Sequence, residues 1–142
     1  PDPVRGRGQR LKVVINVDGG SRGNPGPAAI AAVATDPDGE VLAERAETIG
    51  EATNNVAEYR AMLLGIELAK ELGADEVALI GDSELIVQQV RGRYKIKQDH
   101  LRPLHTKVID ELRGLDQWSI RTVKRERNVR ADELVNEALD SV

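Results

Sequence analysis

The chain has 142 residues, a formal net charge of −4 and no cysteine, with 40% hydrophobic and 31% charged residues. This length supplies one domain with a substantial core but not two comfortable ones, and the lack of cysteine excludes disulfides and thiolate metal sites. No run of residues approaches the roughly 20 apolar residues of a membrane helix, and no secretory signal is visible. We therefore expect a cytoplasmic protein with no membrane partner, in which any nucleic acid would be bound by local basic segments such as 91–107 and 121–130 rather than by overall positive charge.

The amino-terminal third predicts a short tail followed by three strands. Residues 1–10 contain two prolines, two glycines and three arginines, which is typical of a disordered tail or a vector-derived remnant, so the domain is expected over 11–142. Alternating apolar residues predict a strand over 11–17, and a small apolar run predicts a second over 28–35. The Asp-Pro-Asp-Gly sequence at 36–39 predicts a turn and residues 40–49 a third strand, which together indicate an antiparallel meander.

The remaining residues predict alternating helices and strands. A helix is expected over 53–72, capped by Thr53 or Asn54 and ended by Gly73. It is followed by a strand over 77–80, helices over 83–90 and 98–112, a strand over 117–124 and a helix over 129–139. This order predicts an α/β domain with a mixed five-stranded sheet and helices on both of its faces.

Four of the 24 acidic residues stand at predicted element ends rather than on solvated faces. Asp18 ends the first strand, Glu58 lies in the first turn of the 53–72 helix, Asp82 follows the fourth strand, and Asp132 begins the last helix. Taken singly, each has a structural explanation, as an Asx-turn residue, a helix cap or a favourable charge at a helix amino terminus. Because the sheet topology brings all four toward one edge, we expect a cluster whose mutual repulsion is relieved by divalent cations.

The chemistry of such a cluster is that of hard oxygen ligands, which select Mg²⁺ or Mn²⁺. Two such ions about 4 Å apart activate a water molecule and stabilise the leaving oxygen of a phosphodiester. The Gly-rich loop that follows Asp18 lets the backbone approach a substrate closely.

The chain resembles type 1 ribonuclease H over about residues 11–141. Four motifs stand in the order and spacing of that family: Asp-Gly-Gly-Ser-Arg-Gly-Asn-Pro-Gly at 18–26, Thr-Asn-Asn-Val-Ala-Glu-Tyr at 53–59, Gly-Asp-Ser at 81–83 and Ala-Asp-Glu-Leu at 131–134. The resemblance implies the ribonuclease H-like fold, with strand order 3-2-1-4-5 and strands 1 to 3 antiparallel. It also implies an endoribonuclease that hydrolyses the RNA strand of RNA–DNA hybrids by a two-metal-ion mechanism, leaving 5′-phosphate and 3′-hydroxyl ends.

The same resemblance assigns roles to individual residues of a protein expected to be a monomer. The metal-binding catalytic acids would be Asp18, Glu58, Asp82 and Asp132, holding two Mg²⁺ ions, with Mn²⁺ as a substitute. Substrate contacts would come from the glycine loop and the start of the 53–72 helix. Gly19 would bind the substrate, Ser21, Gly23 and Asn24 would contact RNA 2′-hydroxyls, Asn54 and Asn55 would lie in the minor groove, and Thr53 would bind a DNA phosphate.

Three features depart from the pattern of many relatives. The loop at 123–130 lacks their histidine, and Arg125 is the first candidate to replace it, with Arg127 second; His100 and His105 lie on another segment and are expected at the surface. The basic handle is shortened to 91–97, which predicts weaker hybrid affinity and a steeper loss with salt. Glu51 stands where some relatives carry an arginine in the DNA-phosphate pocket, so activity on double-stranded RNA is a further hypothesis.

Other functional classes fit the sequence less well. A non-catalytic hybrid-binding module would be expected to lack an acid or to have a disrupted loop, and neither is seen. An actin-like or sugar-kinase phosphotransferase needs two domains, and a P-loop enzyme needs Gly-Lys-Ser/Thr after its glycines. A junction resolvase or integrase would share the acids but not the Thr-Asn-Asn-x-Ala-Glu helix start. The absent initiator methionine and the end directly after the last helix indicate a piece of a longer protein.

Overall fold

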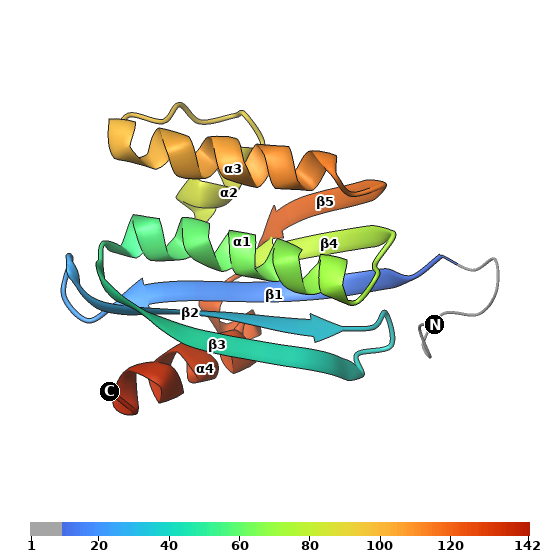
Figure 1. Ribbon diagram of the computed structural model, residues 1–142, viewed down its shortest axis with the longest axis horizontal. Helices are drawn as coiled ribbons and strands as arrows, with labels where there is room; N and C mark the ends of the chain where they lie inside the picture. The colour runs from blue at the N-terminus through green and yellow to red at the C-terminus, as the bar shows by residue number, and fades with distance from the viewer. Residues whose placement is uncertain (1–9) are drawn as a thin grey trace.

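A computed structural model describes residues 10–142 of the chain, so the predicted tail at 1–10 lies outside the described residues except for Arg10. Five strands form one sheet in the order β3-β2-β1-β4-β5 (Figure 1). The strands are β1 (Lys12–Ser21), β2 (Gly26–Thr35), β3 (Val41–Ala52), β4 (Glu76–Gly81) and β5 (Gln117–Thr122). Strands β1 to β3 are antiparallel, whereas β4 is parallel to both β1 and β5, which confirms the predicted topology.

Helices cover both faces of this sheet (Figure 1). They are α1 (Asn54–Glu71), α2 (Glu84–Val90), α3 (Arg102–Arg113) and α4 (Val129–Asp140), with short 3₁₀ turns η1 (Asp99–Leu101) and η2 (Arg125–Arg127). Successive residues of β2 point to opposite faces: Ala28 and Ile30 join the main core beneath α1, whereas Ala29 and Ala31 pack against Val135 and Leu139 of α4. The apolar contact that holds α4 is therefore small. Between residues 10 and 142, no helix has the length and hydropathy needed to cross a bilayer.

Several predicted boundaries differ from the structure: β3 runs to Ala52 instead of 49, and β5 ends at Thr122 instead of 124. The two largest differences concern β1 and the helix predicted over 98–112. Strand β1 does not end at Val17, because Asp18 to Ser21 continue the ladder with β2, from Asp18 opposite Ala31 to Ser21 opposite Ala28. The helix predicted over 98–112 is divided into η1 and α3. Pro103 lies in the first turn of α3, where its missing N–H leaves no helical hydrogen bond unmade.

Two glycines allow α1 to lie unusually close to β1. A Cβ atom at Gly19 would lie 2.3 Å from the Ala57 carbonyl oxygen, and one at Gly65 would lie 2.6 Å from Cγ1 of Val17. Both distances are shorter than real Cβ contacts, so a side chain at either position would force neighbouring atoms to shift, and at Gly19 these are backbone atoms of α1. At Gly19 this close approach brings the amino-terminal part of α1, and with it Glu58, against the carboxyl-terminal part of β1.

Candidate active site

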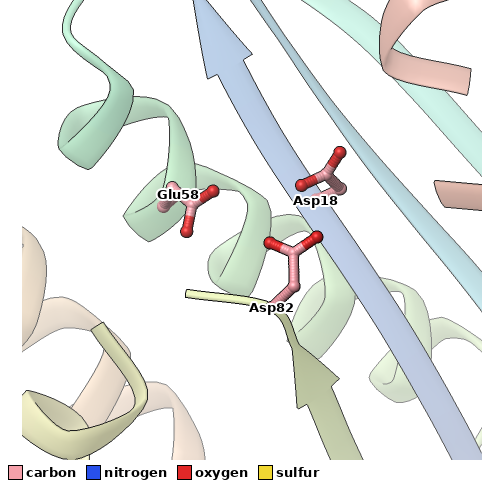
Figure 2. A group of neighbouring side chains, drawn as sticks. All are labelled: Asp18, Glu58 and Asp82. Atoms are coloured by element: carbon pink, nitrogen blue, oxygen red, sulfur yellow. The ribbon is translucent and has the colours of Figure 1, made fainter. Parts of the chain in front are cut away.

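Three carboxylates from three different elements converge at the carboxyl-terminal end of the parallel strands. One carboxylate oxygen from each of Asp18, Glu58 and Asp82 lies within 4.8 Å of the others. Figure 2 shows Asp18 on β1, Asp82 just after β4 and Glu58 on α1, with their carboxylates facing one another. The sequence-based expectation that these acids gather at one place is therefore met by the geometry.

Strand pairing explains why two of these acids are neighbours. The parallel pairing of β1 with β4 ends at Asn16 opposite Ile80. Asp18 and Asp82 each stand two residues beyond that last pair, so the two strands place these acids side by side. The carboxyl ends of parallel strands are where α/β proteins place their functional groups. Ser83 caps α2 by accepting a hydrogen bond from the Ile86 N–H at 3.4 Å, so Asp82 is not needed as the cap.

The position of Glu58 is set by its place along α1, not by a favourable interaction of its charge with the amino terminus of this helix. The helix begins at Asn54, with Thr53 as N-cap and no acidic residue in the first turn. The prediction that Glu58 lies in the first turn was therefore wrong, and the alternative explanation of a charge stabilised by the helix end loses its basis. Ser83 lies beside Glu58 and lowers the pKa of its carboxyl group.

Asp132 completes the group from the opposite face of the sheet. It lies in the first turn of α4, outside the tight trio, yet it lines the same cavity of about 570 Å³ and raises the pKa of Asp18. Besides its small apolar contact, two arginines hold α4 in place. Arg130 donates from Nε and Nη2 to both carboxylate oxygens of Glu44 on β3, at 2.8 and 3.0 Å. Arg22 forms an ion pair with Asp140 of α4 at 2.7 Å.

The electrostatics of the site favour an added positive charge. Burial, followed by the charges of the neighbouring Asp82, Glu58 and Asp132, raises the pKa of Asp18, which is only 8% exposed, to about 8. Burial also raises the pKa of Glu58 to about 7, against the lowering effects of the Ser83 hydrogen bond and of Arg125. Divalent cations favour the ionised forms of such groups, and a donor set made only of carboxylate oxygens suits Mg²⁺ or Mn²⁺. The residues present therefore fit a metal site.

The glycine loop and the start of α1 form one hydrogen-bonded unit beside the acids. The Asn54 side-chain oxygen accepts from the Ser21 N–H at 2.9 Å and from the Ser21 hydroxyl at 3.1 Å, while the Asn54 N–H donates to the Asn24 side chain at 3.0 Å. Gly23 has φ +101°, a conformation that favours glycine. These hydrogen bonds fix the glycine loop beside the cavity that the acids line.

The predicted substrate residues divide into two groups. Those that line the cavity are Gly19, Ser21, Asn54 and Asn55. Gly23, Asn24 and Thr53 do not line it and instead support the unit, with the Thr53 hydroxyl accepting from the Val56 N–H at 3.3 Å. Glu51 is exposed near the end of β3.

The arginine candidates for the missing histidine differ in position. Arg125 lines the cavity together with the acids, whereas Arg127 does not.

The expectation that both histidines lie at the surface was wrong for His105, which is half-buried because α3 packs on α1. Its Nε2 lies 3.1 Å from the Gln89 carbonyl oxygen, and its ring meets Tyr59 edge-on at 6.4 Å. His100 is exposed.

Asn128 is a polar residue of the site that the sequence did not single out. It is 2% exposed, and its Nδ2 donates to the Val17 carbonyl at 2.8 Å and to Asp82 Oδ2 at 3.5 Å, while its Oδ1 accepts from Asn16 at 3.0 Å. An asparagine directly before a helix is normally interpreted as a cap, but this side chain makes no cap hydrogen bond. It joins β1, the end of β4 and the start of α4, which carry three of the four acids.

The chain matches a known family over most of its length. A family model described as reverse transcriptase-like matches residues 16–138. Ribonuclease HI of Halobacterium salinarum is 47% identical over 134 residues, which is 94% of this chain and 66% of that protein. A bifunctional protein of Mycobacterium tuberculosis is 46% identical over 132 residues, which is 92% of this chain and 36% of that protein.

Solved structures agree with these matches. The crystal structure of RNase H1 from Halobacterium salinarum superposes with a TM-score of 0.90 at 45% identity, covering 92% of this chain and 99% of that one. LC11-RNase H1, solved in complex with an RNA/DNA hybrid, gives a TM-score of 0.86 at 44% identity, covering 91% and 97%. The chain spans slightly less than two thirds of the full halobacterial protein and about a third of the mycobacterial one.

Proposed function

We propose that this chain, which belongs to the type 1 ribonuclease H family, is an endonuclease. It would hydrolyse the RNA strand of RNA–DNA hybrids. Products with 5′-phosphate and 3′-hydroxyl ends are expected. The observation that carries the proposal is the convergence of Asp18, Glu58 and Asp82 within 4.8 Å, with Asp132 in the same cavity. A hybrid bound to LC11-RNase H1 supports the choice of substrate.

The four acids would hold two divalent ions, with Mg²⁺ the expected metal and Mn²⁺ a substitute. When bound, such ions supply an activated water for attack on phosphorus and stabilise the leaving 3′-oxygen. The carboxylates themselves fix where the reaction occurs, because they are delivered by β1, β4, α1 and α4 rather than by a mobile loop. Asn128 orients Asp82 through a hydrogen bond, and Ser83 lies beside Glu58.

The hydrogen-bonded unit of Ser21, Asn24 and Asn54 would read the strand that is cut. The lining of the cavity of the acids by Ser21 and Asn54 supports this role, because contacts of hydroxyl and amide groups with 2′-hydroxyls let a protein distinguish RNA from DNA. Arg125, which lines the same cavity and lowers the pKa of Glu58, is the cation proposed to approach the scissile phosphate. Its guanidinium would stabilise negative charge there but would not carry a proton at neutral pH.

Activity on double-stranded RNA is a second candidate, favoured by one observation. Glu51 presents a negative charge near the end of β3, close in sequence to Thr53, the residue expected at a DNA phosphate. A site that holds the DNA strand weakly discriminates less against a second RNA strand. Cleavage of an RNA duplex, at conditions that consume an equal amount of hybrid, tests this candidate, and no product would end it.

The main test is a hybrid labelled on one strand at a time. With Mg²⁺, the labelled RNA should be cut internally while the labelled DNA stays intact, and the RNA fragments should carry 5′-phosphates that a phosphatase removes. Cutting of both strands, or of single-stranded RNA at an equal rate, would contradict the proposal. A single species at the mass of one chain, measured by light scattering, would support the expected monomer.

A further inference from the structure

Arg22 lies in the glycine loop, and its side chain reaches across to α4. Its Nη2 forms an ion pair with Asp140 Oδ1 at 2.7 Å and donates to the side-chain oxygen of Asn136 at 3.3 Å. Its backbone N–H donates to the Pro27 carbonyl at 2.8 Å, which closes the loop. Arg22 also lines the cavity of the acids, yet it is neither one of the acids nor one of the predicted substrate contacts.

Asn136 continues this contact toward the fourth acid. Its Oδ1 accepts from Arg22, and its Nδ2 donates to the backbone carbonyl of Asp132 at 3.1 Å, four residues earlier in α4. Asn136 itself lines the cavity. A continuous series of polar contacts therefore joins the glycine loop to the turn of α4 that carries Asp132.

The position of Asp132 depends on such contacts because α4 is held by few apolar ones. Its buried contact with β2 is small, and Asp132 stands outside the trio of acids whose oxygens lie within 4.8 Å of one another. Segments with few buried apolar contacts open locally at a low free-energy cost. Arg130 restrains the amino-terminal end of α4 through Glu44, and Arg22 restrains the carboxyl-terminal end through Asp140.

The glycine loop, at the other end of these contacts, is the segment expected to hold the RNA strand. Ser21 and Gly23 are the direct neighbours of Arg22, and Ser21 is tied to α1 through Asn54. A strand bound to the loop restricts the motion of the loop, and with it the motion of Arg22. Two sites that stabilise the same arrangement of the chain are coupled, so that occupation of one favours the other.

We propose that Arg22 is a positioning residue that couples binding of the RNA strand at the glycine loop to the placement of Asp132. The inference rests on the proposed function, in which the loop holds that strand and Asp132 is a metal ligand. An ordered loop holds Arg22, Arg22 holds the carboxyl-terminal half of α4, and Asp132 then stays beside the other acids. Without the arginine the trio of acids is intact, and only the fourth acid is loosened.

Three variants separate this role from the loss of any exposed charge. Arg22→Gln removes the contact, Asp140→Asn removes one of its partners, and a double variant combines the two changes. Arg113→Gln is the matched control, because Arg113 also forms an exposed ion pair on a helix, with Asp110 at 3.5 Å. For each protein, kcat and KM for a hybrid are measured over a range of Mg²⁺ concentrations.

A second measurement does not depend on cleavage. Hydrogen exchange of the α4 amides is recorded for the metal-free protein, and again for Asp82→Asn protein with and without bound hybrid. Each recording is repeated after Arg22→Gln is introduced.

The expected result is a loss in rate rather than in binding. Arg22→Gln should lower kcat roughly tenfold and raise the Mg²⁺ concentration needed for half the maximal rate by a similar factor, while KM changes less than about twofold. Asp140→Asn should give a smaller loss, because Arg22 keeps its contact with Asn136, and the double variant should be no slower than Arg22→Gln alone. Arg113→Gln should behave as wild type.

Hydrogen exchange should show the same coupling directly. In the metal-free protein, Arg22→Gln should speed exchange in the carboxyl-terminal half of α4. Bound hybrid should slow exchange there in Asp82→Asn protein, but not once Arg22→Gln is added.

Three results would overturn the inference. Wild-type kcat and wild-type exchange of α4 in Arg22→Gln would show that the contact restrains nothing. A rise in KM alone, with protection of α4 by the hybrid retained, would make Arg22 a direct substrate contact instead. Additive losses in the double variant would show that Arg22 and Asp140 act separately. Absence of cleavage by the wild-type protein would count against the proposed function, whereas exchange in the metal-free protein reports on Arg22 in either case.

Discussion

Replacement of Asn128 by alanine is the perturbation for which the structure gives the clearest consequences. The side chain is buried and joins three elements, because it hydrogen-bonds Asn16 and Val17 of β1 and Asp82 after β4 while its backbone begins α4. Alanine removes all three side-chain contacts and supplies no replacement. We expect loss of both stability and activity.

The size of the effect follows from the groups left without partners. The Val17 carbonyl and the Asn16 amide would each lose a partner at 2.8 and 3.0 Å. The buried Val17 carbonyl left unsatisfied costs about 1 to 3 kcal/mol, and the hydrogen bond lost by the half-buried Asn16 costs about 0.5 to 1.5 kcal/mol, so the free energy of unfolding should fall by about 2 to 5 kcal/mol. In a chain of this length that corresponds to a fall in Tm of roughly 5 to 15 °C.

The assay combines thermal unfolding with steady-state cleavage of a hybrid at a temperature where the variant is folded. Loss of the contact to Asp82, and of the tie between β1 and α4, should lower kcat by roughly 10- to 100-fold, because a displacement of about 1 Å in a catalytic group has that effect. Glu133→Ala, an exposed position on α4, serves as control and should change the free energy of unfolding by less than about 0.5 kcal/mol. A Tm within 2 °C of wild type together with unchanged kcat in Asn128→Ala would refute this reasoning.

Three further predictions concern single features of the site. Gly19→Ala should lower the free energy of unfolding by about 1 to 3 kcal/mol, because the added Cβ would meet the Ala57 carbonyl. Gly20→Ala should be tolerated, because a Cβ there has no neighbour closer than 4.0 Å. Equal Tm values for the two variants would contradict this prediction. Burial and the neighbouring acids raise the pKa of Asp18 from 3.8 to about 8, so protonated Asp18 stabilises the fold fully below pH about 4 and this stabilisation is lost as the pH rises through about 8. The increase in Tm on adding Mg²⁺ should therefore be larger at pH 9 than at pH 6. An increase in Tm that does not depend on pH would argue against the site. Arg125→Ala should lower kcat by roughly 10- to 100-fold, and a larger effect from Arg127→Ala in the same kinetic assay would exchange their roles.

The sequence was sufficient for the topology and for the acids because local patterns specify both. Alternation in β1, a run of small apolar residues in β2 and a turn at 36–39 predict the meander, and Ser83 as N-cap leaves Asp82 without a structural role. The family motifs then order the strands. The strand order is confirmed by the sheet as observed.

What the sequence could not supply depends on contacts between distant segments. The end of β1 was misplaced because glycines favour a loop locally, yet pairing with β2 keeps Gly19 and Gly20 in the strand. The role of Asn128 depends on partners more than 100 positions away, and its location before a helix indicates a cap instead. His105 was placed at the surface because its contact with Gln89 arises only when α3 packs on α1 and α2.

The measurement that tests the central claim most directly is cleavage of an end-labelled RNA–DNA hybrid by wild-type protein and by Asp82→Asn, each with Mg²⁺, with Mn²⁺ and with chelator. We predict metal-dependent cutting of the RNA strand by the wild type and at least a 100-fold lower rate in the variant, since the change removes one metal ligand while leaving the fold and hybrid binding intact. Cutting that persists in chelator, or that survives in Asp82→Asn at the wild-type rate, would contradict a carboxylate metal site. Hybrid binding without cleavage by the wild type would indicate a binding module instead of an enzyme.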